Sequence, residues 1–316
     1  MKTGATTYYQ VADHLFAVQT DDSALLALMT NYEPFKTQPA ISTDVLPIFQ
    51  LQASQNGLLE AAHIANYQLL FTDQSDEDMP RIEVFQTQYP TSIAQDGGWL
   101  LRVSQIAHSP ICCEIECTRD FAKGLLHIAH DCQDLRFCID NALMLLFAFC
   151  TAPLKTLEMH AAVVVKPQAQ QELAYLFLGH SGTGKSTHAR QWLKAFPDAW
   201  LLNDDNPILR VMEDGDIRVY GSPWSGKTPC YIIANVQVGA IVKLSQAPVN
   251  QIAKLLLPQA YAYMLSSASG LKIETQMADH LYQTIKHIIT HLQCYHLACL
   301  PNTQAAECCW LGICNN

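Results

Sequence analysis

Two short stretches of this chain fit the same phosphate-loop pattern, G-x-x-x-x-G-K-[ST]. They are GHSGTGKS at residues 179–186 and GSPWSGKT at residues 221–228. In such a loop the backbone N–H groups converge on a phosphate, and glycines let the backbone come close to it. The helix that follows points its positive end at the anion. The sequence around each stretch therefore indicates which of them can do this chemistry.

The first stretch has the context that a phosphate loop requires. The apolar run LAYLFL, residues 173–178, precedes it and predicts a strand, and THARQWLKAF, residues 187–196, follows with one apolar helical face. A tight glycine-rich turn would explain the glycines but would leave Lys185 and Ser186 without a role. We expect Lys185 to reach the β- and γ-phosphates and Ser186 to coordinate Mg²⁺. The predicted nucleotide-binding residues are Gly179, His180, Ser181, Gly182, Thr183, Gly184, Lys185, Ser186 and Thr187.

The second stretch lacks this context. Pro223 removes an N–H group, Trp224 is bulky, and Pro229 follows directly. The next residues, 230–244, predict a strand and not a helix. We do not expect a second nucleotide loop here, and two roles stay open. In the first, Lys227 would reach the transferred phosphate from the side opposite Lys185. In the second, the stretch would be a structural loop packed around Trp224.

Two aspartates end the strand predicted at residues 199–205, only a short distance after the phosphate loop. Phosphoryl transfer needs a carboxylate for the metal, and another often accepts the proton of the acceptor hydroxyl. We therefore expect Asp204 and Asp205 to act in catalysis, with Asp204 and Ser186 as metal ligands; the alternative is an Asx-rich turn at residues 203–207.

A histidine, His160, lies in the first strand of the hairpin predicted at residues 157–178. If Val165 lies opposite Leu173, antiparallel pairing places His160 opposite Leu178, beside the phosphate loop. We therefore predict an active-site role for His160, which the nearby carboxylates would support. The alternative is a satisfied core histidine.

The pattern of elements changes near Pro153. Before it, alternating segments at residues 14–20, 46–52, 81–88 and 98–104 predict a mostly antiparallel sheet, followed by a helix at residues 135–152. An acidic stretch, residues 73–78, is expected in a loop. After Pro153 the order strand, loop, helix, strand predicts an α/β domain. The expected domains are residues 1–153, α+β and rich in antiparallel strands, and residues 154–316.

Composition limits the partners of the protein. Apolar residues make up 49% of the chain and charged residues 15%, which predicts large buried surfaces and leaves room for a homo-oligomer interface. Residues 1–150 carry 7 Lys and Arg against 18 Asp and Glu, and residues 151–316 carry 12 against 11. Because no basic stripe is present, neither nucleic acid nor a membrane surface is an expected partner.

No secretion signal or membrane span is evident in the sequence. The longest apolar run, residues 142–152, is shorter than the ~20 residues that a membrane span needs. We therefore expect a cytoplasmic protein whose twelve cysteines are reduced thiols.

Three motifs together resemble a known family. HAAVVV (160–165), GHSGTGKST (179–187) and LLNDDNP (201–207) resemble the kinase domain of the HPr kinase/phosphorylase family and, more distantly, the nucleotide core of ATP-dependent phosphoenolpyruvate carboxykinases. The chain is more similar still to HPr-kinase-related, carboxykinase-like proteins of Bacteroides-type bacteria, in which GSPWSGKTP also occurs. This resemblance covers residues 155–316. The first half matches only those close relatives.

The resemblance implies a P-loop kinase domain with a mixed sheet. It implies that residues 179–186 bind the ATP phosphates, that Asp204 and Asp205 serve the metal and proton transfer, and that His160 is the family's histidine before the loop. Asp205 is the implied base, although the two aspartates could exchange roles. The arginine-containing signature for phosphorolysis and the arginines that bind oxaloacetate have no counterpart, so neither the reverse reaction nor carboxykinase activity is expected.

The sequence thus predicts an ATP- and Mg²⁺-dependent kinase whose acceptor is a hydroxyl, of a serine in a peptide or protein or of a small molecule. Within that reading the predicted catalytic residues are Asp205, Asp204, His160, Lys185 and Lys227. The acidic first half would recognise the acceptor or mediate assembly. The alternative is a nucleotide-binding sensor or assembly module without phosphotransfer activity. A transport ATPase is disfavoured because no LSGGQ-like segment is present.

Overall fold

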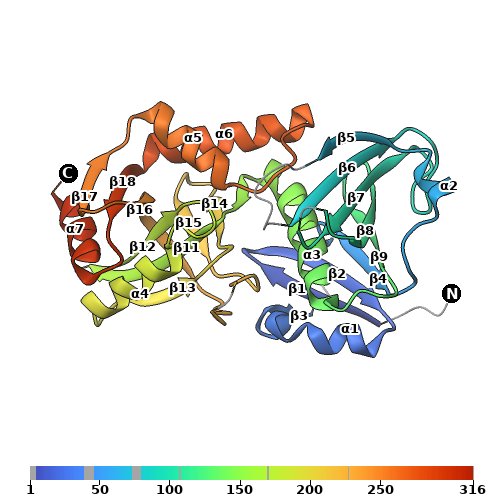
Figure 1. Cartoon of the computed structure of the whole chain (residues 1–316), viewed down its shortest axis with the longest axis horizontal. Coiled ribbons are helices and arrows are strands. Elements are labelled where there is room, and N and C mark those ends of the chain that lie inside the picture. The colour runs from blue at the N-terminus through green and yellow to red at the C-terminus, as the bar shows by residue number, and fades with distance from the viewer. Residues whose placement is uncertain are drawn as a thin grey trace. The chain divides into compact units, whose positions relative to one another are not determined.

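The chain is α/β and divides into two compact units, each built on one large mixed sheet (Figure 1). The computed structural model describes residues 5–38, 46–72, 80–106, 108–168, 171–226 and 228–315. The first unit is Met1–Cys150 and the second is Thr151–Asn316. The division lies close to the predicted boundary at Pro153. The acidic loop predicted at residues 73–78 lies outside the described residues.

The first unit contains a nine-stranded sheet in the order β3-β1-β2-β4-β9-β8-β7-β6-β5. Most neighbouring strands are antiparallel, as expected, but β4 pairs in parallel with both β2 and β9. The predicted strand at residues 46–52 begins only at Gln50. The strands are β1 Ala5–Val11, β2 His14–Thr20, β3 Lys36–Thr37, β4 Gln50–Ser54, β5 Gln68–Thr72, β6 Arg81–Thr87, β7 Gly98–Ser104, β8 Ile111–Thr118 and β9 Lys123–Ile128.

One long apolar helix, α3 (Leu135–Thr151), packs on this sheet. The ring of Phe147 meets Phe16 edge-on, and Phe149 does the same with Phe121. The segment Leu135–Leu154 is long and apolar enough to cross a membrane, but 56% of its most apolar stretch is buried. Core helices of soluble proteins share these properties, so the fold is consistent with a soluble protein. The short helices of this unit are α1 Ser23–Leu28, η1 Thr30–Phe35 and α2 Ala61–Ile64.

The second unit is built on a sheet whose three central strands, β12, β16 and β18, run parallel to one another. Their carboxyl ends therefore meet at the same edge of the sheet, where ligands gather in open α/β folds. The order is β10-β14-β15-β16-β12-β11-β13, and β18 also pairs with β16 and β17. The strands are β10 Thr156–Glu158, β11 Ala161–Gln168, β12 Gln171–Leu178, β13 Trp200–Asn203, β14 Ile208–Val211, β15 Ile217–Tyr220, β16 Asn235–Gln246, β17 Gln251–Lys254 and β18 Gln293–Cys299.

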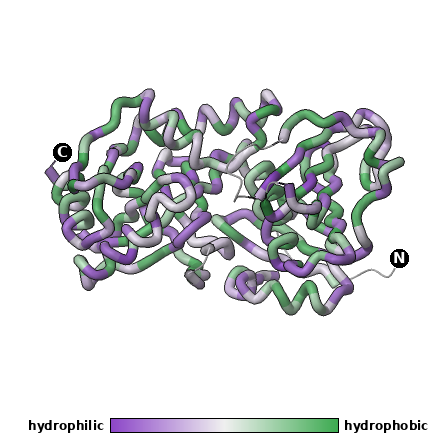
Figure 2. The backbone as a smooth tube through the Cα atoms, viewed as in Figure 1, coloured by the Kyte–Doolittle hydropathy of each residue, from purple (hydrophilic) through white to green (hydrophobic). Residues whose placement is uncertain are grey.

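Helices cover both faces of this second sheet (Figure 1). Helices α5 (Leu257–Ser267) and α6 (Thr275–His291) share one apolar core with the sheet, and α4 (Lys185–Ala195) and α7 (Thr303–Cys314) share the other. Figure 2 shows polar and apolar residues alternating along α6, as expected of a helix with a single face on the core. The short helix η2 (Ala152–Leu154) opens the unit.

Two predicted features of the second unit are wrong in detail. Val165 pairs with Ala174 and not with Leu173, because the strands continue through the polar residues and leave only residues 169–170 between them. Pairing of Val165 with Leu173 would require an odd number of residues between the strands, whereas two residues separate Gln168 from Gln171, so the register differs by one residue. The strand predicted from residue 230 begins only at Asn235.

We expect Trp192→Ala to lower the free energy of unfolding of the second unit by about 3–5 kcal/mol. Trp192 is fully buried, packs among Tyr175, Phe177 and Trp310, and donates its indole N–H to His188. Urea denaturation followed by circular dichroism measures the loss. Trp200→Ala is the matched control, since Trp200 is only half-buried, and a loss as large as that of Trp192→Ala would contradict the prediction.

Candidate active site

Four neighbouring strands of the second sheet bring the predicted site residues to one edge. In the order β13, β11, β12 and β16, the aspartate pair follows β13, His160 precedes β11, and Gly179 follows β12. The registers align these positions, because Ala161 lies opposite Leu178 and Val163 lies opposite Asn203. Adjacent strands lie ~4.8 Å apart, so segments distant in sequence become neighbours in a row.

The loop between β12 and α4 has the backbone that a phosphate cradle needs. Gly182 and Gly184 have φ angles of +75° and +106°, in a region that residues with a side chain rarely adopt. Gly184 caps α4 without a side-chain hydrogen bond, and no acidic residue lies in the first turn. The first N–H groups of α4 therefore have no capping side chain among the described residues. Ser186 and Thr187 lie half-buried in this turn, while Ser181 is exposed.

The ammonium group of Lys185 is held inside this loop. The residue is only 7% exposed, and its Nζ donates to the carbonyl oxygen of Gly179 at 3.0 Å and to that of His180 at 3.4 Å. Its third partner is Nε2 of His160, at 2.8 Å. Burial lowers the pKa of Lys185, and the negative charge of Asp205 opposes this effect. A buried cation held by neutral acceptors is well prepared to bind an anion.

His160 is a neutral member of this cluster. Because an ammonium group can only donate, Nε2 of His160 must accept, so the proton of the neutral ring is on Nδ1. Burial, followed by the positive charge of Lys185, lowers the pKa of His160 to about 4. Its Nε2 also lies 3.4 Å from Oδ1 of Asp205. The histidine therefore lies next to both the lysine of the loop and Asp205.

The two aspartates occupy different environments. Asp205 lies on the turn after β13, where its N–H donates to the side chain of Asn203 and its carbonyl accepts from Ala161. Burial raises the pKa of Asp205, Lys185 lowers it, and the charge of Asp204 raises it again. Asp204 is only 6% exposed, and its buried Oδ1 has no hydrogen-bond partner among the described residues. Asp205 thus has the properties of a base, and Asp204 retains an acceptor atom for another group.

The stretch GSPWSGKTP packs against this aspartate turn. Trp224 is buried, and its carbonyl accepts from the N–H of Asn206. The hydroxyl of Ser222 donates to the carbonyl of Asn206 at 2.6 Å and accepts from the side chain of Asn203 at 3.0 Å. Residues 222–226 therefore make the contacts expected of a structural loop packed around Trp224, which was one of the two roles considered for this stretch. Lys227 lies outside the described residues, so its phosphate contact stays a prediction.

Two further residues at this edge were not predicted from the sequence. Lys243 of β16 lies opposite Leu178, next to the start of the loop, and its charge contributes to the lowered pKa values of Lys185 and His160. Glu158 of β10 is 1% exposed, and neither carboxylate oxygen has a hydrogen-bond partner among the described residues. Burial and then the charge of Asp205 raise the pKa of Glu158 well above its usual range. The only sequence signal for either residue was its closeness to a predicted strand end.

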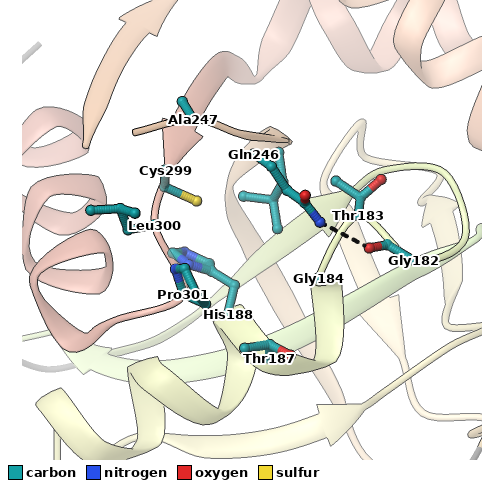
Figure 3. A pocket seen from close by; sticks show the side chains of 11 residues that line it. Gly182, Thr183, Gly184, Thr187, His188, Gln246, Ala247, Cys299, Leu300 and Pro301 are labelled. Atoms are coloured by element: carbon teal, nitrogen blue, oxygen red, sulfur yellow. Dashed lines mark hydrogen bonds between the residues drawn. The ribbon is translucent and has the colours of Figure 1, made fainter. Parts of the chain in front are cut away.

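A cavity of about 560 Å³ adjoins the loop on the side of α4 (Figure 3). Ala247, Cys299 and Leu300 lie on one side of it, across from Gly182 and Thr183 of the loop. The side-chain amide of Gln246 donates to the carbonyl of Gly182 at 3.2 Å. The remaining residues around the cavity are Gly184, Thr187, His188, Leu244 and Pro301.

The packing of residues 222–226 against the aspartate turn predicts the effect of Gly226→Ala. Gly226 has a φ of +63°, and an added Cβ would lie 2.9 Å from Cβ and Oδ2 of Asp205. We expect a loss of stability of more than the ~1–2 kcal/mol that this backbone conformation alone costs. Gly215→Ala is the matched control, since Gly215 has a φ of +88° and nothing lies within 4 Å of an added Cβ. Thermal denaturation compares the two variants, and equal losses would contradict contact with Asp205.

The structure thus brings together Lys185, His160, Asp204 and Asp205 at the edge that carries the predicted phosphate loop. It also places the predicted nucleotide residues 179–187 in one turn between β12 and the first turn of α4. Compared with known proteins, the sequence matches no family model and no curated protein.

Proposed function

We propose that this protein is an ATP- and Mg²⁺-dependent kinase, related to the HPr kinase type, that phosphorylates a serine hydroxyl of a peptide or protein. One observation supports this function best. The ammonium of Lys185, inside the loop at the start of α4, contacts neutral His160, which lies 3.4 Å from the raised-pKa carboxylate of Asp205. A phosphate-binding cation and a base are therefore neighbours at one sheet edge.

In this proposal the loop binds the phosphate chain of ATP. The N–H groups at the start of α4, which have no capping side chain among the described residues, and the Lys185 ammonium would bind its oxygens. Gly182 and Gly184 let the backbone approach the phosphates closely. His160 positions Lys185 through the 2.8 Å contact and adds no charge of its own, because its pKa is lowered to about 4.

The residues present fit a magnesium ion held jointly with the nucleotide. Asp204 supports this fit. Its buried Oδ1 lacks a hydrogen-bond partner among the described residues, as expected of an atom that faces a cation. Ser186, in the first turn of α4, would supply the second protein oxygen. The described residues contain no group of three or more His, Cys, Asp or Glu side chains that could hold a metal. Mg²⁺ commonly takes only one or two protein ligands beside phosphates and water, and when bound it neutralises phosphate charge.

Asp205 is the proposed general base. Its carboxylate takes the proton of the acceptor hydroxyl as the hydroxyl oxygen bonds to the γ-phosphorus and the bond to the β-phosphate oxygen breaks. The products are a phosphate ester and ADP, and the proton stays on Asp205 until solvent removes it. The raised pKa of Asp205 favours this step, because a base works best when its pKa approaches the working pH.

Lys243 is a second cation that fits the transferred phosphate. Its Nζ lies 5.5 Å from the centre of the Tyr263 ring. Among the described residues no carboxylate forms an ion pair with it. Burial lowers the pKa of Lys243, and its charge acts on both Lys185 and His160. A partly buried cation without a counter-ion, next to a phosphate loop, gains most from an anion that arrives with the substrate.

We expect Asp205→Asn to abolish transfer while leaving nucleotide binding intact, because an amide cannot accept the hydroxyl proton. Wild-type protein and the variant are incubated with γ-labelled ATP, Mg²⁺ and soluble lysate of the host. Label should appear on a discrete acceptor with wild type alone. Thermal shift with Mg-ATP should be similar for the two proteins, since a ligand of the folded state raises its stability.

The same experiment separates the alternative function from the proposed one. Tight binding of Mg-ATP by wild type with no labelled acceptor would support a nucleotide sensor or assembly module. Equal labelling by wild type and Asp205→Asn would remove Asp205 from its proposed role as base.

We expect Lys243→Ala to lower the rate of transfer by about 10²-fold or more, the usual effect of removing one group that stabilises transition-state charge. Binding of Mg-ATP should change much less. Lys243→Arg retains the charge and should keep more activity than Lys243→Ala. Lys254→Ala is the control for loss of one positive charge, since Lys254 is exposed on β17. Transfer by Lys243→Ala at the wild-type rate would contradict this role.

A further inference from the structure

The cavity beside the phosphate loop lies at the carboxyl ends of two parallel strands. Gln246 ends β16 and Cys299 ends β18, and these two residues pair with each other across the sheet. The first turn of α4 forms another wall through Thr187 and His188. The same loop therefore borders two spaces, this cavity and the cluster around Lys185.

The cavity and Lys243 lie on opposite faces of the sheet. Leu244 belongs to the apolar core shared with α4 and α7, and it lines the cavity. Lys243, the preceding residue of β16, lies near Tyr263 of α5, on the other face. Alternate residues of a strand point to opposite faces, so β16 places Lys243 and the cavity on opposite faces of the sheet. A ligand that occupies both spaces has to pass along the loop that joins them.

The lining of the cavity suits an uncharged group with both apolar and polar surface. None of its residues carries a carboxylate, an ammonium or a guanidinium group. Leu244, Ala247, Leu300 and Pro301 supply apolar surface, and Thr187 and the amide of Gln246 supply polar groups. A volume of about 560 Å³ falls within the ~300–1,000 Å³ range of small-molecule sites.

His188 adds a hydrogen-bonding group of known polarity to the wall. The indole N–H of Trp192 can only donate, so Nε2 of His188, 3.0 Å away, must accept, and the ring proton is on Nδ1. Burial lowers the pKa of His188 to about 4, which keeps the ring neutral. Its tautomer is thus fixed by the packing of α4 and needs no ligand.

We infer that this cavity binds the nucleoside half of the nucleotide, with the heteroaromatic base between the Leu244–Ala247 segment and residues 299–301 and the ribose near Thr187. The inference rests on the proposed function, because the phosphates have to lie in the adjacent loop. The base enters on the α4 face, and the γ-phosphate meets Lys185, His160 and Lys243 on the α5 face. The nucleoside is thereby kept away from the acceptor.

The experiment fills the cavity without touching the loop. Ala247→Trp places an indole among the apolar lining residues, and Val249→Trp is the matched control on the same connection, outside the lining. Binding of Mg-ATP and of Mg-tripolyphosphate, which has phosphates but no nucleoside, is measured by calorimetry. We expect Ala247→Trp to weaken Mg-ATP binding by about tenfold or more, as does loss of a stacked base, and to leave tripolyphosphate binding unchanged. Val249→Trp should change neither.

A second measurement uses the native thiol in the cavity. Cys299 lines it, and Cys308 of α7 does not. Saturating Mg-ATP should slow alkylation of Cys299 by iodoacetamide, whereas Mg-tripolyphosphate should not, and Cys308 should react alike in both. The reaction is run at mildly alkaline pH, because burial raises the pKa of Cys299. Peptide mass spectrometry measures the alkylation of each cysteine separately. Because this experiment uses the wild-type protein, it tests the nucleoside assignment even if Ala247→Trp does not fold.

The outcomes distinguish failure of this inference from failure of the proposed function. The nucleoside assignment would be overturned if Ala247→Trp bound Mg-ATP as tightly as wild type does, or if saturating Mg-ATP did not protect Cys299 from alkylation. Either result would leave the proposed binding of phosphates by the loop unaffected. Equal affinity of wild type for Mg-ATP and Mg-tripolyphosphate would have the same two consequences. If wild type binds neither compound, the proposed function fails and takes the inference with it.

Discussion

The burial of the Lys185 ammonium is the constraint on which the site depends. A buried cation is costly unless polar groups surround it, and here two loop carbonyls and the ring of His160 do so. These acceptors require the loop to curl back over the end of β12, which two glycines with positive φ permit. They also require His160 to lie at the start of β11, so the lysine, the loop and the hairpin determine one another's geometry.

The order of the strands extends this constraint to the aspartates. Strand β11 lies between β12 and β13, so the turn after β13 ends next to His160 and not next to the loop itself. Residues 222–226 pack on the far side of that turn through Trp224, Ser222 and Gly226. The second phosphate-loop-like stretch is thus part of the support for Asp205, whatever Lys227 contributes.

The acidic first unit also uses charged residues inside its fold. Glu116 of β8 is fully buried and accepts from the hydroxyl of Tyr67 at 2.7 Å, while His63 lies 2.9 Å from it. Glu114, two residues earlier on the same strand, accepts from Arg102 and from the N–H of Leu59. These contacts hold residues 59–67 on the sheet, so part of the acidity is structural. Acceptor recognition and assembly remain predictions for this unit.

The local elements around the site follow from the sequence. Loop residues 179–184, the apolar face of α4 and a strand close before the aspartate pair could be predicted from glycine spacing and periodicity, because these depend on near neighbours in the chain, although β13 ends at Asn203 and not at Asp205. The sequence could not give the hairpin register or the order of the strands, since both depend on pairing between distant segments. Only the tertiary structure therefore placed Lys243 and Glu158 at the site, the Gly226 backbone against Asp205, and the cavity of Leu244 and Cys299 beside the loop. Each of these arrangements brings together side chains that no local pattern connects, and packing alone decides which of them meet.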